Sequence, residues 1–303
     1  MNTQTRTDWL AQRRTGIGGS DVAAILGLSK WRTPLDVYLD KRGESAEQSD
    51  NPAMRWGRAL EPVVLNAYAD ETGREVLKTE GIIAHPEHDW MLANLDGFTE
   101  EPRVVEVKTA RMATGWGEPG TDEVPDDYAL QVQHYMAVTG FPEADIAVLI
   151  GGSDFRIYTV RADPDLERSV FLRLQKFWQQ VQDGIAPEPV NYSDAVQRFG
   201  HSGAAGYVSA SAPVERAVVE LRRLRDQRAA IEEQENEQKA IVFKALGDQG
   251  DTLIDPAGRT LATWRLAKGR ESFDTAAFKA AHPSLYPQFT KTGEASRRLL
   301  IKD

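Results

Sequence analysis

Two neighbouring apolar runs constrain the fold most, because charged groups interrupt each of them in a strand-like pattern. In Val104–Lys108, valines alternate with Glu106 and Lys108. Side chains at positions i and i+2 of a β-strand point to one face, so Glu106 and Lys108 are expected together, with the intervening valine facing a core. Upstream, Asp96 ends an apolar run that begins at Trp90. If the two runs pair as a hairpin, Asp96 reaches the edge at which Glu106 and Lys108 project.

Two carboxylates beside an ammonium form a candidate site for a divalent metal. Asp96 and Glu106 offer the hard oxygen ligands that Mg²⁺ prefers, with Mn²⁺ as a substitute and the Val107 carbonyl as a further ligand. Such a metal polarises a phosphoryl oxygen and lowers the pKa of a bound water. Lys108 would orient that water and stabilise developing negative charge. Exposed strands also carry Glu and Lys on one face, so the proposed phosphodiester chemistry depends on the rest of the chain.

Composition narrows the class of protein. The 303 residues contain no cysteine, which excludes disulfides, Cys-ligated zinc and iron–sulfur clusters. No window approaches a membrane span and no signal peptide is recognised, so a cytoplasmic protein is expected. The net charge of −10 is unusual for a protein that binds nucleic acid. It is unevenly distributed, because residues 194–303 carry 17 Lys and Arg against 15 Asp and Glu.

Hydrophobic periodicity predicts an α/β (α+β) core with a mixed central sheet flanked by helices. The expected helices and strands alternate along the chain: helix 54–72, strands 81–84, 90–95 and 103–109, helix 126–138, strands 146–150 and 155–160, and helix 163–182. A break in composition after residue 189 separates an expected domain 1–193 from an appendage, 194–303. The appendage is predicted to contain a polar helix over 213–246 and a hairpin over 252–266, and its role is unknown.

Three further groups of residues are candidates for the site. Glu61 lies on the first long predicted helix and would supply a third carboxylate, although an isolated helical glutamate is more often simply exposed. Gln131 and Gln133 offer amides that could hold a water or a phosphate, although helical glutamines commonly face solvent. Arg14 precedes a glycine-rich turn that enters a helix at Ser20. A helix N-terminus attracts anions, and arginine binds phosphate through two hydrogen bonds.

In this order, the motifs resemble those of the phage lambda-type exonuclease family, also called YqaJ-like viral recombinases, a branch of the PD-(D/E)xK nuclease superfamily. The resemblance covers roughly residues 8–189 and rests on five motifs: Arg14 to Ser20, Trp56-Gly57-Arg58-x-x-Glu61, Leu95-Asp96-Gly97, Glu106-x-Lys108 and Gln131-x-Gln133-x-Tyr135. It implies a restriction-endonuclease-like core. The chain departs from the family at Leu95, where a proline is usual, and in a stretch before Ser20 that is one residue shorter.

The resemblance also implies roles for individual residues. Asp96 and Glu106 correspond to the metal ligands and Lys108 to the catalytic lysine. Glu61 corresponds to an accessory metal-site carboxylate and Gln133 to a catalytic glutamine. Arg14 and Ser20 correspond to the residues that hold a 5′-phosphate end, and Gln131 is expected to be a further contact to DNA.

The function implied is that of a Mg²⁺-dependent 5′→3′ exonuclease that digests double-stranded DNA from its ends during phage or prophage recombination in a bacterial cytoplasm. A single-strand annealing protein is an expected partner, a ring-shaped homo-oligomer, favoured as a trimer, is the expected assembly, and no membrane partner is expected. Two alternatives stay open from the residues. One is a structure-specific or restriction-type endonuclease on the same fold, and the other is a non-catalytic recombination scaffold that binds DNA or an annealing protein.

Overall fold

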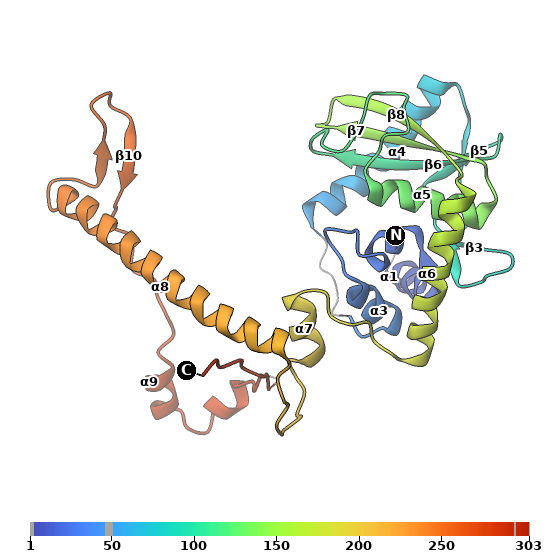
Figure 1. Ribbon diagram of the computed structural model, residues 1–303. Helices are drawn as coiled ribbons and strands as arrows, with labels where there is room; N and C mark the ends of the chain where they lie inside the picture. Colours follow the sequence, from blue (N-terminus) through green and yellow to red (C-terminus); the bar gives the residue numbers. More distant parts are fainter. Residues whose placement is uncertain (1–2, 46–50, 294, 303) are drawn as a thin grey trace. The chain divides into compact units, whose positions relative to one another are not determined.

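A five-stranded mixed sheet forms the centre of the first of the two compact units into which the chain divides, residues 1–198 and 199–303 (Figure 1). The computed structural model describes residues 3–45, 51–293 and 295–302. In order across the sheet, the strands are β2 (Val76–Leu77), β5 (Gly97–Thr99), β6 (Arg103–Ala110), β7 (Glu143–Ile150) and β8 (Asp154–Arg161). Strands β6 and β7 run parallel, and the other neighbours run antiparallel.

Both connections around β7 follow from local sequence. Helix α5 (Asp126–Thr139) links β6 to β7, since parallel strands need a long crossover. Strand β7 is almost wholly buried and apolar, as expected of a strand with neighbours on both sides. It turns into β8 through Gly151 and Gly152, whose φ angles of 60° and 80° suit a tight hairpin.

The two faces of the sheet are covered by different helices. Helix α4 (Pro52–Thr72) places Val64 and Tyr68 in one core cluster with Val105 and Val107 of β6. Helix α5 packs its apolar side chains against Val104 and other residues on the opposite face. Because the faces alternate along β6, Glu106 and Lys108 share the side of Val104, toward α5.

A second, smaller sheet lies within the same unit. It consists of β1 (Ile17–Gly18), β4 (Met91–Ala93) and β3 (Ile83–Ala84), with β4 in the middle. The remaining helices of the unit are α1 (Thr3–Arg13), α2 (Gly19–Ile25), α3 (Pro34–Arg42), α6 (Pro164–Asp183) and α7 (Tyr192–Phe199). Helices α2, α3 and α6 bury a second apolar cluster between them. The boundary expected between residues 193 and 194 lies inside α7.

Close packing of α2 on α5 determines where the start of α2 lies. A Cβ atom at Gly19 would come within 2.6 Å of the Tyr135 ring and 2.9 Å of the Gln131 carbonyl oxygen, so only glycine permits this approach. Beside it, the buried Nε2 of His134 lies 3.1 Å from the carbonyl oxygens of both Ile17 and Leu92. The imidazole therefore joins β1 and β4 to α5.

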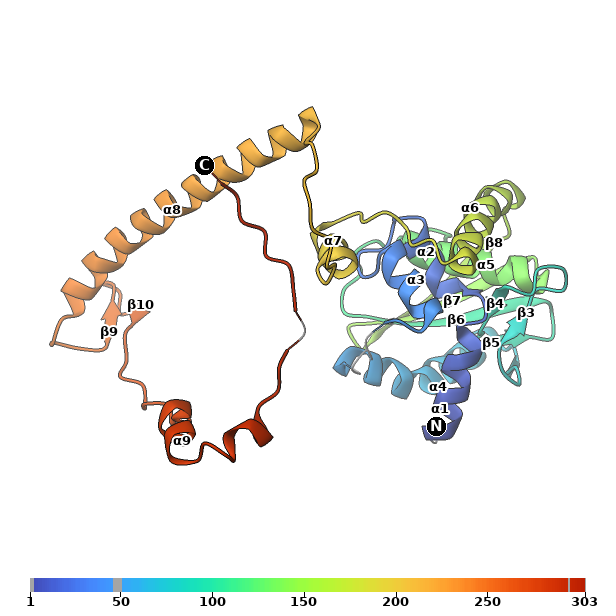
Figure 2. The same cartoon turned by 90° about the horizontal axis from the view of Figure 1, so that it is seen from below.

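The second unit contains little besides one long helix and a hairpin. Helix α8 (Ala212–Leu246) is followed by the antiparallel strands β9 (Thr252–Ile254) and β10 (Thr260–Thr263). Figure 2 shows this hairpin at the C-terminal end of α8, drawn in orange. A short helix, α9 (Thr275–Ala281), and a 3₁₀ turn, η1 (Tyr286–Phe289), come next.

The expected fold class is confirmed by this arrangement. A mixed sheet is flanked by helices, and a helix with a hairpin follows it along the chain. Within the described ranges, no helix is both long enough and apolar enough to cross a bilayer.

Candidate active site

Strands β5 and β6 bring Asp96, Glu106 and Lys108 to one place. The β5–β6 pairing aligns Gly97 with Val105, so Asp96 comes just beyond the paired residues. There its Oδ2 accepts a hydrogen bond of 2.8 Å from the Val107 amide. On β6, the Lys108 ammonium donates to Glu106 Oε1 over 2.5 Å. The hairpin expected from the sequence therefore forms and places both carboxylates at the same edge.

Helix α5 completes this cluster with Gln131, which is almost fully buried. Its side-chain amide nitrogen donates to Glu106 Oε1 over 2.7 Å and to the Tyr135 hydroxyl over 3.0 Å. Its side-chain oxygen accepts from the Lys108 ammonium over 3.0 Å. One glutamine thus contacts both Glu106 and Lys108 and fixes their positions relative to each other.

Gln133, to which the resemblance gives a catalytic role, lies away from this cluster. Its amide group donates to the Arg161 carbonyl over 2.7 Å and accepts from the Asp163 amide over 3.0 Å, so it joins the end of β8 to the start of α6. Helical residues two apart are separated by roughly 200° around the axis, and the two glutamines therefore lie on opposite faces of α5. The spacing of four residues between Gln131 and Tyr135 puts their side chains on one face of α5, the face that contacts Glu106.

The two carboxylates are in electrostatic conflict. Burial and the nearby Glu106 carboxylate raise the pKa of Asp96 to about 8, although the Val107 amide and Lys108 act in the opposite direction. Glu106 is 2% exposed, and its Oε2 atom is buried with no hydrogen-bond partner. A bound cation would supply a partner for the buried Glu106 oxygen, and its positive charge would favour the ionised form of Asp96.

Lys108 keeps its positive charge in this environment. Burial alone would lower its pKa, but Glu106, followed by Asp96 and Tyr128, raises it overall. The ammonium also lies 4.7 Å from the centre of the Tyr128 ring, a cation–π distance. The lysine is therefore a fixed cation and a hydrogen-bond donor rather than a base.

Glu61 lies on α4, near this cluster but outside its hydrogen-bond network. Its carboxylate pairs with Lys78 over 3.3 Å and is 31% exposed. It still contributes to the raised pKa of Asp96, which means that its charge acts at the same edge.

The donor set fits a metal that keeps much of its water shell. Across the described residues, no three His, Cys, Asp or Glu side chains are close enough to bind an ion together. The candidate ligands are therefore the carboxylates of Asp96 and Glu106 and the Val107 carbonyl. The amide and carbonyl of one strand residue point to the same edge, so the carbonyl of Val107 faces the side on which its amide meets Asp96. Mg²⁺ commonly binds one or two carboxylates and retains several waters.

A second polar cluster surrounds the start of α2. Asp21, fully buried, accepts from Lys41 over 2.7 Å and from Arg32 over 2.8 Å, and Arg13 lies 3.3 Å away. Although burial raises it, these three cations together hold the pKa of Asp21 well below its usual range. Arg13 also donates to the Ser20 hydroxyl over 3.1 Å. One carboxylate thus organises three cations and leaves an excess of positive charge beside Ser20.

The arginine beside Ser20 is Arg13 and not the expected Arg14. The Arg14 guanidinium instead lies 3.9 Å from Asp40, which also pairs with Arg32. Both arginines come at the end of α1 and its following turn, where neighbouring side chains diverge by about 100°. The sequence offered two adjacent arginines, and no pattern of spacing distinguished them.

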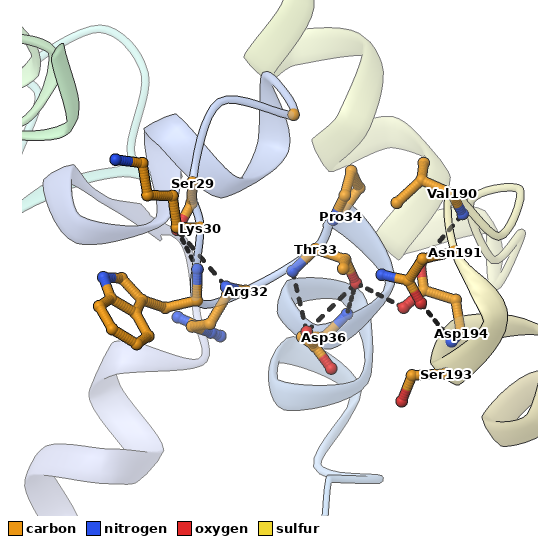
Figure 3. A pocket seen from close by; sticks show the side chains of 12 residues that line it. Ser29, Lys30, Arg32, Thr33, Pro34, Asp36, Val190, Asn191, Ser193 and Asp194 are labelled. Carbon is orange, nitrogen blue, oxygen red and sulfur yellow. Dashed lines mark hydrogen bonds between the residues drawn. The ribbon is translucent and has the colours of Figure 1, made fainter. Parts of the chain in front are cut away.

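A pocket lies beside these residues. It has a volume of about 290 Å³ and lies between the loop before α3 and residues 190–194. Figure 3 shows the Thr33 hydroxyl between two carboxylates, with hydrogen bonds to Asp36 and, over 3.0 Å, to the buried Asp194. Asp194 also accepts from the Val190 amide. These bonds anchor the segment before α7 to α3, and the pocket contains none of the residues around Glu106.

Comparison with known proteins identifies relatives of the first unit. Residues 8–142 match the family model of the YqaJ-like viral recombinase domain. The chain is 38% identical over 188 residues to the uncharacterized protein YqaJ of Bacillus subtilis (strain 168), an alignment that covers 60% of this chain and 59% of that protein. The chain therefore spans less than two thirds of the length of this curated relative.

Among solved structures, the fold is similar to LHK-Exo, an alkaline exonuclease from Laribacter hongkongensis. The identity is 22% and the TM-score 0.49, with 59% of this chain and 94% of that chain covered. A phage-related exonuclease from Haemophilus somnus 129PT is also similar, with 15% identity, a TM-score of 0.42, and 56% and 96% of the two chains covered.

The raised pKa of Asp96 predicts how stability depends on pH. In the unfolded chain this carboxyl ionises near pH 4, whereas in the folded protein it holds its proton to about pH 8. Its contribution to stability is therefore complete below about pH 4 and is lost as the pH rises through about 8. In urea unfolding with EDTA, the wild type should lose stability relative to Asp96→Asn between pH 5 and 9, and Mg²⁺ should reduce that loss. Parallel pH profiles for the two proteins would contradict the raised pKa.

Proposed function

We propose that this chain, whose residues 8–142 match the model of the YqaJ-like viral recombinase domain, is a divalent-metal-dependent deoxyribonuclease that digests double-stranded DNA from its ends in recombination. The observation that carries the proposal is the cluster of Asp96, Glu106 and Lys108. In this cluster, the Asp96 and Glu106 carboxylates repel each other, and one Glu106 oxygen is buried without a donor. The positively charged ammonium of Lys108 lies beside them.

Asp96, Glu106 and the Val107 carbonyl would hold Mg²⁺, or Mn²⁺ in its place, with Glu61 as an accessory carboxylate. When bound, such an ion supplies Lewis-acid polarisation of a phosphoryl oxygen and a water of lowered pKa. Lys108 contributes a fixed positive charge next to the position of the scissile phosphate, where negative charge develops. Gln131 holds Glu106 and Lys108 in register, so their geometry is formed before substrate arrives.

Arg13 and Ser20 are suited to hold the 5′-phosphate of a DNA end. A guanidinium binds phosphate through two parallel hydrogen bonds, and a hydroxyl adds a donor. Asp21 positions Arg13 and Arg32 without neutralising both of them, so the cluster retains positive charge. Recognition of a 5′-phosphate end supports 5′→3′ polarity for the digestion. A single-strand annealing protein as partner and a ring of three copies around the duplex remain parts of this proposal.

Glu106→Gln should lower Mg²⁺-dependent digestion of a linear duplex by at least about 100-fold, because it removes a ligand charge and keeps the shape of the side chain. The assay follows linear duplexes labelled at either 5′ or 3′ ends, with closed circular DNA in parallel. Glu87→Gln, at an exposed position of the same unit, is the control and should digest at the wild-type rate. Undiminished digestion by Glu106→Gln would refute the site, and rapid nicking of closed circles would favour the endonuclease alternative.

The two glutamines of α5 make a matched pair of variants. Gln131→Ala should reduce the digestion rate by about 10- to 100-fold, since Glu106 and Lys108 both lose the amide that orients them. Gln133→Ala should stay within about twofold of the wild type, because its amide bonds only to backbone groups near the start of α6. Initial rates at saturating Mg²⁺ distinguish the two, and the reverse order of effects would show that the wrong face of α5 has been assigned.

Arg13→Ala and Arg14→Ala test recognition of the DNA end. Loss of the Arg13 guanidinium should slow digestion of 5′-phosphorylated duplexes by about 10- to 100-fold more than that of 5′-hydroxyl duplexes. Arg14→Ala should affect both substrates alike. The ratio of rates on the two substrates cancels any general loss of folded protein. An equal loss on both substrates in Arg13→Ala would mean that this cluster does not bind the terminal phosphate.

A further inference from the structure

Helix α8 is unusually long and unusually exposed for its composition. It spans 35 residues, and Leu246 at its end is its only buried residue in the described structure. Several large apolar side chains of the helix are exposed, among them Leu224 at 47% and Ile231 at 63%. Helices in proteins gain most of their stability from packing one face against a partner, so an exposed helix of this length indicates an unfilled contact.

One row of positions along α8, spaced alternately by three and four residues as in a heptad repeat, is mostly apolar. The seam contains Val214, Ala217, Leu221, Leu224, Ile231, Val242 and Ala245, and it is interrupted by Arg228, Glu235 and Gln238. Such a seam is typical of a helix that packs along another helix. Two contacts of α8 within its own unit lie off this seam: Arg222 donates to the Lys302 carbonyl, and Phe243 stacks on Trp264 at 4.3 Å.

Charge is divided between the two halves of the helix. The first half is rich in arginine, with Arg216, Arg222, Arg223, Arg225 and Arg228. The second half contains a glutamate cluster, Glu232, Glu233, Glu235 and Glu237. A parallel pair of identical helices would set Arg228 against Arg228 and Glu235 against Glu235 in the seam, which opposes like charges. An antiparallel pair sets the arginine-rich half of each helix against the glutamate-rich half of the other.

We propose that α8 is a self-association element, which pairs with α8 of a second copy of this chain in an antiparallel coiled coil. When the two seams are aligned layer against layer, which leaves the helices overlapped over all but one residue at an end, Arg228 of each copy lies opposite Ile231 of the other. Arg225 and Arg228 then lie within about 2 Å, along the axis, of the levels of Glu235 and Glu232 on the other helix. The polar residues of the seam thereby select both orientation and register, a role that such residues have in coiled coils.

Charge reversal tests this pairing in the full-length protein. Arg225→Glu with Arg228→Glu should raise the dissociation constant for self-association through α8 at least about 10-fold, and so should Glu232→Arg with Glu235→Arg. A mixture of the two doubly substituted proteins should associate as well as the wild type, because every opposed pair again has opposite signs. Sedimentation velocity at several concentrations measures this, and circular dichroism checks that helix content is retained. Failure of the mixture to associate better than either variant alone would overturn the proposal.

The absence of cysteine allows an independent test that is specific to α8, whatever association the first unit makes. In the antiparallel register, Ala217 of one copy lies opposite Val242 of the other. A mixture of Ala217→Cys and Val242→Cys proteins should therefore form a disulfide-linked heterodimer on mild oxidation. Ala217→Cys alone should not crosslink, because its two thiols lie about 37 Å apart along the axis. Efficient crosslinking of Ala217→Cys with itself would show a parallel pair and overturn the assignment.

Discussion

The arrangement of the candidate site in the first unit depends on the hydrogen bonds of the Glu106 side chain. Glu106 is an acidic group on the central strand of a buried sheet, so it requires partners where little water reaches. Lys108 on the same strand and Gln131 on α5 supply those partners through one carboxylate oxygen. One oxygen of Glu106 is hydrogen-bonded within the protein, and the other lies next to Asp96 without a donor. Glu106 is therefore both a part of the packed interior and a candidate metal ligand.

Strand periodicity made this part of the site predictable from sequence. A two-residue repeat leaves only two faces, so Glu106 and Lys108 had to lie together, and one hairpin was enough to add Asp96. Helices gave less certainty, because a shift of a single residue rotates a side chain by about 100°. Both differences from the expected contacts are of this kind. Gln131 rather than Gln133 contacts Glu106, and Arg13 rather than Arg14 contacts Ser20.

The sequence shows where the glycines lie, but it does not show why glycine is needed at each position. Gly97 suggests a sharp turn after Asp96, but its φ angle is not in the left-handed region. A Cβ atom there would instead lie 2.4 Å from a methyl carbon of Val76, so glycine is required for the contact between β5 and β2. Similarly, Gly19 allows α2 to approach α5. In both cases the constraint comes from a segment distant in sequence, which local patterns do not reveal.

The two units satisfy their apolar residues in opposite ways. In the first, helices cover both faces of the sheet and bury its apolar side chains. In the second, the seam of α8 stays open although the helix and hairpin make their own contacts. The first half of α8 is rich in arginine and the second half is rich in glutamate. When two copies of the helix pair in opposite directions, each arginine-rich half lies against a glutamate-rich half, and the two helices attract each other. The pattern of charge along α8 therefore favours pairing with a reversed copy of the same helix.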